Sequence, residues 1–212
     1  MSTAGCGVTN AGATEDRKNT RMKTVYLVLD MQNDLVSEDG PNGKSPLGAE
    51  VRGRGILART AAAIGKARKA GAAVGFVRVA FSPNYAECPA GSPIFAPAKA
   101  NNLFRLGTPG VEIHPQLGRQ EGDWLVTKHR VSPFYATDLD AYLRANGIGR
   151  IVCSGVSTQA VVQATIRDGH DRDYAMVLLE DCCAAHSAEE HRNSVGSLGR
   201  FGAIGEVTFK VF

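Results

Sequence analysis

The sequence predicts an α/β fold with three layers, in which a six-stranded, mostly parallel sheet carries helices on both faces. Short apolar runs of strand length alternate along the chain with segments in which apolar residues recur at the helical period. The short runs are almost continuously apolar, which is typical of parallel strands that are buried on both faces. In such folds ligands bind beyond the carboxyl ends of the strands, so we expect the functional residues there.

Six segments are expected to form the strands. In chain order they are residues 25–30 (VYLVLD), 73–79 (AVGFVRV), 124–128 (WLVTK), 150–154 (RIVCS), 175–181 (AMVLLED) and 206–210 (EVTFK). Between the second and third strands the chain carries five prolines between positions 83 and 109, which predicts an irregular segment there.

Four segments are expected to form helices: residues 55–71, 137–149, 157–173 and 187–202. The second begins with Thr137 three residues before Asp140, and the last begins with Ser187 three residues before Glu190. A hydroxyl residue followed at this spacing by an acidic residue is typical of a helix start, so we expect both pairs to cap their helices.

Length and composition indicate one globular domain. The chain has 212 residues, of which 43% are hydrophobic and 21% are charged. Residues 1–23 are rich in small and polar types and are expected to form a flexible tail, whereas residues 24–212 are expected to form the single domain.

The net charge of +3 arises largely before the first strand, so no basic patch and no nucleic-acid partner is expected. The chain has no apolar run of about 18 residues, so no membrane-spanning helix is expected. Five cysteines, an odd number without CxxC spacing, favour reduced thiols and a cytoplasmic location.

Two charged residues stand at predicted strand ends. Asp30 ends the first strand, where burial would raise the pKa of its carboxyl group unless a cation lies nearby. Lys128 ends the third strand and can supply that cation. A carboxylate and an ammonium group that converge on one cleft can transfer protons in catalysis, and a purely structural ion pair is the alternative.

The stretch SGVSTQAVVQATIRDG, residues 154–169, joins a predicted strand to a predicted helix. Gly155 permits an unusual backbone turn, and Thr158, which can cap the helix, is expected at the pocket. The N–H groups of the first helical turn can stabilise an anion. Ala160 and Val161 lie where that turn would face a pocket, yet neither side chain is reactive.

Four blocks together carry a resemblance to a known family. VYLVLDMQNDLV, VTKHRVSPFYATDLDAYL, GVSTQAVVQATIRDG and LLEDCCAAHSAEEH, in this order, resemble the isochorismatase-like hydrolases, also called cysteine hydrolases, from about residue 24 to about residue 195. The resemblance implies a Rossmann-like, six-stranded parallel sheet and hydrolase activity. Most members hydrolyse amides with an Asp, a Lys and a Cys, and the first two correspond to Asp30 and Lys128.

The resemblance also implies a cis peptide bond between Val156 and Ser157 and an oxyanion hole made by backbone N–H groups around Ser157 and residue 161. The cysteine of the family falls on Val161, so the sequence departs from the family at its nucleophile. A valine cannot attack a carbonyl, so a covalent thioester cannot form there. Isochorismatases, a branch that also lacks the cysteine, cleave an enol ether by proton transfer from the aspartic acid, and such a route needs only Asp30 and Lys128.

We therefore expect a hydrolase that acts on a small molecule by acid-base catalysis, on an enol-ether or a C–N bond. Two alternatives remain open. An amidase could use a relocated cysteine, for which Cys88, Cys153, Cys182 and Cys183 are the candidates within the predicted domain, or the chain could bind a small ligand without turnover. Relatives commonly form dimers or tetramers, so a homo-oligomer is expected.

Further pocket residues are expected around these groups. Gln32 follows Asp30 directly and is expected at the pocket floor, while Phe134 and Tyr135 are expected as aromatic walls. His129 should point away from Lys128, because neighbouring strand residues face opposite sides. The five histidines show no metal-binding spacing, and the Asp-x-His loop of nicotinamidase-like relatives is missing, so no metal and no cofactor is expected.

Overall fold

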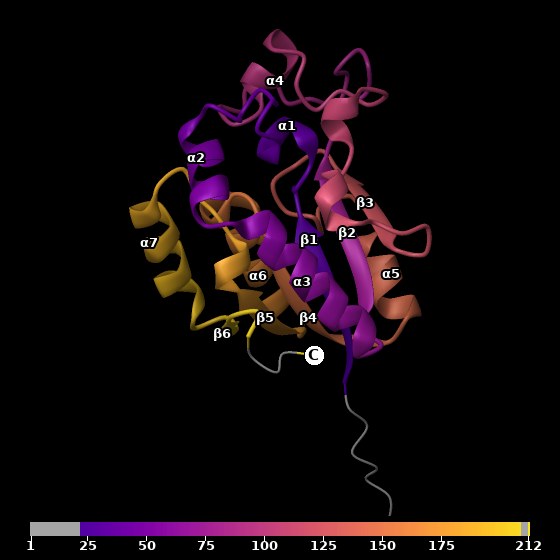
Figure 1. Cartoon of the computed structure of the whole chain (residues 1–212). Helices are drawn as coiled ribbons and strands as arrows, with labels where there is room; N and C mark the ends of the chain where they lie inside the picture. The colour runs from indigo at the N-terminus through magenta and orange to yellow at the C-terminus, as the bar shows by residue number, and fades with distance from the viewer. Residues whose placement is uncertain (1–21, 209–211) are drawn as a thin grey trace, which may run out of the picture.

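A six-stranded sheet forms the centre of the computed structural model, which describes residues 22–208 and 212 (Figure 1). The strand order is β3-β2-β1-β4-β5-β6, and every neighbouring pair is parallel. The predicted α/β class and its Rossmann-like parallel sheet are confirmed. The strands are β1 (Lys23–Leu29), β2 (Ala73–Val79), β3 (Trp124–Lys128), β4 (Ile148–Gly155), β5 (Ala175–Leu179) and β6 (Ala203–Gly205).

The order in which the chain adds parallel strands to the sheet reverses at the middle of the sheet. From β1 the chain moves outward through β2 to β3, and then returns to the other side of β1 to form β4, β5 and β6. In open parallel sheets a crevice opens where the strand order reverses, beyond the carboxyl ends of the two central strands. The ends of β1 and β4 therefore lie at the natural position for a ligand site.

Helices cover both faces of the sheet because the side chains of β1 alternate between them. Tyr26 and Val28 pack in one apolar cluster with residues of α2 (Pro46–Gly53) and α3 (Ile56–Lys69). Val25 and Leu27 pack in a second cluster with residues of α5 (Leu139–Ala145), α6 (Gln163–His170) and α7 (Ala188–Leu198). All four side chains are fully buried, so β1 is the centre of the core.

A third apolar cluster lies beyond the carboxyl ends of β1, β2 and β3, at the top of Figure 1. It contains the aromatic rings of Phe81, Phe95 and Phe104 from the proline-rich segment, which holds the short helix α4 (Ala96–Ala100). Helix α1 (Asn33–Val36) and the 3-10 turn Pro109–Val111 complete this end of the molecule, whereas the 3-10 turn Pro115–Leu117 packs against α3. The segment predicted as irregular thus folds into a cap over the sheet.

The last predicted strand is wrong in position. Residues 203–205 form β6, whereas 206–208 lie in no strand and 209–211 lie outside the described residues. The backbone N–H of Val207 donates to Asp181 Oδ1 at 3.0 Å. This N–H is therefore taken up by a side chain instead of the sheet, which explains why the alternating pattern of EVTFK does not extend the strand.

Of the two helix caps predicted from the sequence, the structure contains one. Ser187 precedes α7 and its Oγ accepts from the N–H of Glu190 at 3.1 Å, which confirms the predicted cap. The pattern at Thr137 is wrong, because its hydroxyl accepts from Leu139 N at 3.2 Å. Asp140 instead accepts from Arg144 Nε at 2.8 Å.

The predicted tail can be followed only at its end. Residues 1–21 lie outside the described residues, and Lys23, placed in the tail by the sequence, is the first residue of β1. In the part of the chain that is described, no helix has the length and apolar character needed to cross a membrane.

Candidate active site

Asp30 and Lys128 meet above the carboxyl edge of the sheet. Asp30 follows β1 with a φ of 56°, an uncommon value that aspartate tolerates better than most residues. Its backbone N–H donates to Val77 O at 2.9 Å, which fixes the turn against β2. Lys128 ends β3, on the far side of β2. The two side chains therefore reach toward each other across the end of the intervening strand.

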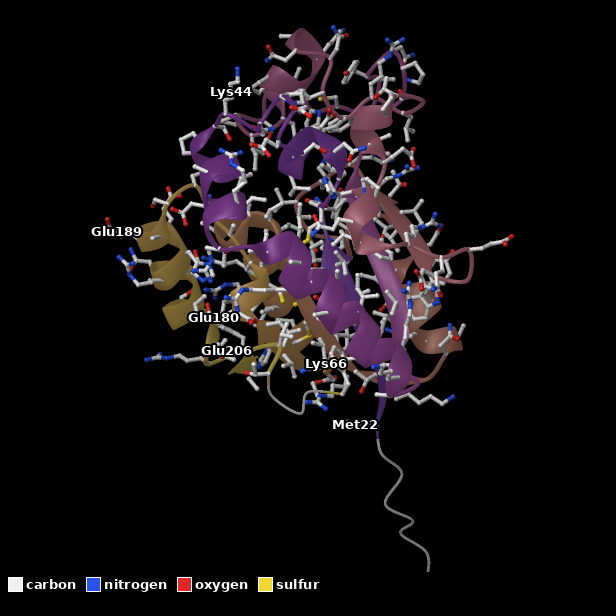
Figure 2. All side chains as sticks on the ribbon, viewed as in Figure 1. Met22, Lys44, Lys66, Glu180, Glu189 and Glu206 are labelled. Atoms are coloured by element: carbon white, nitrogen blue, oxygen red, sulfur yellow. The ribbon has the colours of Figure 1, made fainter. Side chains whose placement is uncertain are left out.

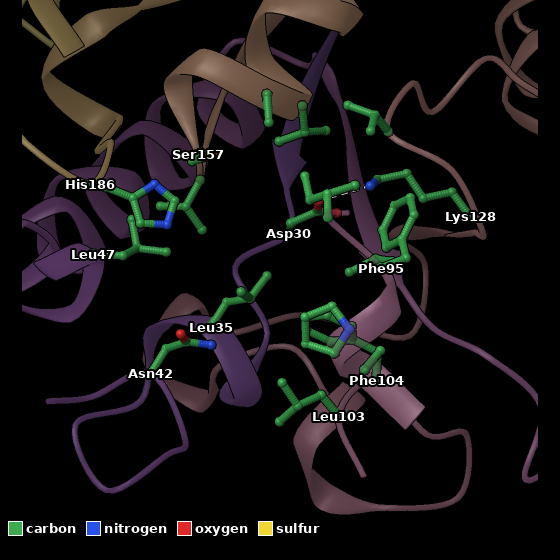
Figure 3. A pocket seen from close by; sticks show the side chains of 18 residues that line it. Asp30, Leu35, Asn42, Leu47, Phe95, Leu103, Phe104, Lys128, Ser157 and His186 are labelled. Atoms are coloured by element: carbon green, nitrogen blue, oxygen red, sulfur yellow. Dashed lines mark ion pairs between the residues drawn. The ribbon is translucent and has the colours of Figure 1, made fainter. Parts of the chain in front are cut away.

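The two groups form a buried ion pair that leaves one carboxylate oxygen free. Lys128 Nζ lies 2.9 Å from Asp30 Oδ2 and donates to Arg130 O at 3.0 Å, and the two side chains are only 2% and 7% exposed (Figure 3). Asp30 Oδ1 is buried and has no hydrogen-bond partner among the described residues. A buried oxygen without a partner is costly, so it is the natural atom to meet a substrate or a water molecule.

Burial raises the pKa of Asp30 above its ordinary value, and the charge and hydrogen bond of Lys128 oppose this effect without cancelling it. The carboxyl group is thus held closer to neutrality than an exposed aspartate. A raised pKa favours the protonated form of a carboxyl group, which can donate a proton, while the ionised form can accept one.

The pair lies at the floor of a cavity of about 350 Å³ whose wall is mostly apolar (Figure 3). Its lining comes from the carboxyl ends of β2 and β3, the segment that follows β1 through α1 and α2, the cap, the turn after β4 and the segment before α7. The lining residues are Asp30, Leu35, Asn42, Leu47, Val79, Ile94, Phe95, Pro97, Ala98, Leu103, Phe104, Lys128, Val131, Val156, Ser157, Ala160, Val161 and His186.

The turn after β4 packs directly against the end of β1. A Cβ atom on Gly155 would lie 2.1 Å from Leu29 O, so only glycine fits this approach. Val156 N then donates to Leu29 O at 3.1 Å, and the peptide bond between Val156 and Ser157 is cis, as the resemblance implied. Val156 and Ser157 both line the cavity next to the ion pair.

Position 161 presents a hydrocarbon side chain to the cavity. Residues Thr158–Val162 form one π-helical turn before α6, and Ala160 and Val161 line the cavity from this turn. Val161 is 2% exposed and packs in the same apolar cluster as α5 and α6. Its side chain therefore shapes the wall and offers no atom that can donate or accept a proton.

Thr158 lies behind the cavity wall and its hydroxyl does not cap the helix, so the predicted pocket position and the predicted cap are both wrong. It is fully buried, and its hydroxyl lies 2.9 Å from His191 Nδ1 of α7. His191 Nε2 lies 3.0 Å from Glu180 Oε2. Because burial lowers the pKa of His191, its ring is neutral near pH 7. A carboxylate only accepts, so Nε2 carries the proton and Nδ1 accepts from the Thr158 hydroxyl.

This hydrogen-bonded chain continues into a cluster of charges on the flank of the molecule. Arg54 Nη2 lies 3.2 Å from Glu180 Oε2, and Arg59 Nη1 lies 3.2 Å from Asp181 Oδ2. Figure 2 shows Glu180 close to Glu206, and both border a polar hollow with the two arginines. The cluster anchors the histidine and, through it, the turn at Thr158. Sequence reasoning missed His191 because its spacing matches no known motif.

Three further predicted pocket residues do not line the cavity. Gln32 is fully buried, and its amide exchanges two 2.9 Å hydrogen bonds with the backbone of Val79, so it joins the floor to β2 from behind. Phe134 is buried in the core and stacks with Tyr174. Tyr135 is 62% exposed and lines a separate, shallower hollow beside Arg130. The local contacts of each of these three side chains thus hold it outside the cavity lining.

None of the cysteines in the described part of the chain lines the cavity. Burial raises the pKa of Cys153 to about 12, and it raises the pKa of both Cys182 and Cys183 still further. Cys88 lies half-buried in the cap, and burial raises its pKa as well. Thiolate is the reactive form, so these environments disfavour a nucleophile. Cys6 lies outside the described residues.

Two polar residues at the cavity mouth were missed. Asn42 comes from the loop before α2, and His186 comes from the segment before α7. Neither residue lies at the end of a strand, and a position at a strand end was the sequence feature from which the site was predicted. His129 Nδ1 donates to Ala80 O at 2.6 Å, and the ring points away from the cavity, as expected. Within residues 22–208 and 212 no group of three or more His, Cys, Asp or Glu side chains could hold a metal ion.

Comparison with known proteins accounts for this arrangement. A family model described as the isochorismatase domain matches residues 24–208, nearly the whole chain. The chain belongs to the isochorismatase family. It is accordingly a hydrolase of that family.

Curated relatives and solved structures agree with this isochorismatase-family membership. Ureidoacrylate amidohydrolase RutB of Methylorubrum extorquens is 33% identical over 200 residues, covering 87% of this chain and 79% of the relative. The uncharacterized isochorismatase family protein YecD of Escherichia coli O157:H7 is 33% identical over 176 residues, covering 82% and 87%. A crystal structure of an isochorismatase family protein from Desulfovibrio vulgaris has a TM-score of 0.78 at 24% identity and covers 88% and 95%, which shows the shared fold.

Proposed function

We propose that this hydrolase cleaves an enol-ether or a C–N bond of a small molecule by proton transfer through Asp30 and Lys128, without a covalent intermediate at position 161. The observation that carries the proposal is the free Oδ1 of Asp30. It lies on the floor of the cavity, held there by an ion pair that engages only Oδ2. The wall above it carries the valine side chain of position 161 where a nucleophile would otherwise stand.

On an enol ether the protonated form of Asp30 acts first. Its Oδ1–H donates the proton to the vinyl carbon, and the carbon that bears the ether oxygen becomes an oxocarbenium ion. Water then attacks that carbon and gives a proton back to the Asp30 carboxylate, and the resulting hemiketal collapses to the carbonyl product and the alcohol. Lys128 stabilises the carboxylate that the proton leaves behind, because its Nζ already lies 2.9 Å from Oδ2.

On a C–N bond the two proton transfers of Asp30 occur in the opposite order. Ionised Asp30 takes a proton from a water molecule as its oxygen attacks the carbonyl carbon, and then returns the proton to the leaving nitrogen. In this route the backbone N–H groups of Ser157 and Val161 form the oxyanion hole. The similarity to a protein named as a ureidoacrylate amidohydrolase supports the inclusion of this bond class.

The placement of the cysteines favours this proposal over an amidase with a relocated nucleophile. Cys153, Cys182 and Cys183 are fully buried, and a substrate in the cavity does not reach them without a rearrangement of the core. The free Oδ1 of Asp30 likewise argues for use in catalysis, because a purely structural ion pair gains nothing from an unsatisfied oxygen.

The test follows substrate loss by mass spectrometry for the purified protein and for Asp30→Asn. The substrates are isochorismate and a panel of carboxamides and ureides, each before and after alkylation of thiols. We expect turnover that disappears in Asp30→Asn and survives alkylation. Turnover that alkylation abolishes would instead indicate a cysteine nucleophile.

A Val161→Cys variant separates a binding protein from an enzyme. If the unmodified protein leaves every compound intact while Val161→Cys gains amidase activity, the natural chain is a ligand-binding member of the family, and the proposal is wrong.

A small-molecule substrate, a homo-oligomer of two or four chains and a cytoplasmic location remain part of the proposal. Light scattering after gel filtration tests the assembly.

A further inference from the structure

The cavity carries no unpaired charge at its floor. Among the eighteen side chains that line it, Asp30 and Lys128 have opposite charges and neutralise each other at 2.9 Å. Arginine is absent from this lining. His186 is the remaining ionisable residue, and its side chain is 54% exposed at the mouth, where solvent screens it. A charged substrate group would therefore find no counter-ion inside the cavity.

An anionic group near the pair would be unfavourable for two reasons. It would lose its hydration in a site where the two nearest charges are already paired, which costs free energy. It would also approach Oδ1, the free oxygen of the Asp30 carboxylate, whose negative charge repels a second anion. A cationic group would meet the Nζ of Lys128 in the same way. Both arguments favour a substrate without formal charge.

The wall above the pair is shaped for a hydrocarbon body. Phe95, Leu103 and Phe104 face the pair from the cap, while Leu35 and Leu47 come from α1 and α2 (Figure 3). The apolar surface continues to the mouth, where Ile94 lines the cavity and is 54% exposed. A volume of about 350 Å³ lies near the lower end of the range for small-molecule sites.

One further polar contact is available at the mouth. Asn42 Nδ2 donates to Asp34 O at 2.9 Å, so this residue can offer its amide oxygen and its second N–H to a ligand. An amide oxygen accepts a hydrogen bond from an uncharged N–H or O–H group. The cavity thus combines an apolar middle with neutral hydrogen-bonding groups at its rim and an acid-base pair at its floor.

We infer that the substrate is an uncharged small molecule with an apolar body, whose amide or enol-ether group lies against Asp30 Oδ1. This inference rests on the proposed function and names its substrate class. It sets this chain apart from the relative named for ureidoacrylate, because an acrylate carries a carboxylate group that this cavity does not neutralise.

Binding of two matched probes tests the inference without any turnover. Benzylacetone and hydrocinnamate differ only in a methyl group and a carboxylate oxygen, and neither contains a bond that the proposed reaction would cleave. We expect calorimetry or ligand-detected NMR with the full chain to show benzylacetone binding at least about tenfold more tightly than hydrocinnamate. Equal or tighter binding of hydrocinnamate overturns the inference, and so does the absence of benzylacetone binding at about millimolar concentration.

Two alanine variants show whether the probe occupies this cavity. Ala160 lines the cavity, whereas Ala164, one turn later in α6, does not. We expect Ala160→Leu to weaken benzylacetone binding at least about tenfold and Ala164→Leu to leave it unchanged. Equal effects of the two variants would place the probe elsewhere and overturn the inference. Because no probe is hydrolysed, failure of the proposed chemistry would leave this result intact.

Discussion

At the scale of single residues, the two carboxylate oxygens of Asp30 lie in different environments. Its Oδ2 is engaged by Lys128, while its Oδ1 is buried without a partner and faces the cavity. An exposed aspartate would be satisfied by water and would be fully ionised near neutral pH. Burial raises the pKa of this carboxyl group, so its protonated form is more accessible than in an exposed aspartate.

The pH dependence of turnover should identify the bond that is cleaved. The folded-state pKa of Asp30 lies above its ordinary value of about 3.9. If the protonated acid acts first, as on an enol ether, kcat/KM is maximal below this pKa and falls as pH rises through it. If the carboxylate acts first, as on an amide, kcat/KM rises over the same interval. A profile that shows neither limb would contradict a role for Asp30.

Removal of one partner of the ion pair should destabilise the fold more than removal of both. Lys128→Met leaves a buried carboxyl group without its cation, and we expect a loss of about 3–5 kcal/mol in the free energy of unfolding. The double variant Asp30→Asn with Lys128→Met should recover most of this loss. Urea unfolding at pH 7 measures both values. A double variant as unstable as Lys128→Met would show that the lysine stabilises the fold by packing alone.

At the scale of elements, α7 supports the turn that forms one wall of the cavity. The turn at Thr158–Val162 has no side-chain cap of its own. Its first residue is held from behind by His191, which is held in turn by Glu180. A helix far along the chain thus fixes the position of Ser157 and Val161 relative to the ion pair.

His191→Ala should therefore lower kcat, beyond its effect on stability. The change leaves the buried Thr158 hydroxyl without a partner, and we expect a loss of about 2 kcal/mol in unfolding free energy. Ser187→Ala, which removes the cap of the same helix, should cost about 1 kcal/mol and leave kcat nearly unchanged. Kinetics well below the unfolding transition compare the two. Equal losses of kcat would mean that α7 acts only through general stability.

Element positions could be predicted where burial alone decides them. β2 and β3 have the predicted bounds, because a continuous apolar run in this pattern has few alternatives to a buried strand. Helix α2 was missed inside a polar loop, although Ser45 caps it by accepting from Gly48 N at 3.2 Å and Pro46 opens it. The serine and proline were the available signal.

At the scale of the whole molecule, the sequence predicted the floor of the site and the wall after β4, but not the walls that the cap, the loop before α2 and the segment before α7 form. Asp30 and Lys128 could be placed because strand ends in a parallel sheet meet at one edge. Asn42, Phe104 and His186 come from three separate connections whose paths depend on tertiary packing. No local pattern in a single sequence records how such segments come together.

Because of the position of β3, the site can open locally at a lower free energy than the whole domain needs to unfold. β3 is five residues long, lies at the edge of the sheet and pairs only with β2. An edge strand can detach without global unfolding, and local openings of this kind need less free energy than unfolding of the whole domain.

Because Lys128 is the last residue of β3, each such opening carries the lysine away from Asp30. We expect urea to abolish activity at a lower concentration than it abolishes the far-ultraviolet circular dichroism signal. Coincident midpoints would mean that β3 unfolds only with the core. The enzyme would otherwise lose function through a fraying strand while most of its structure remains intact.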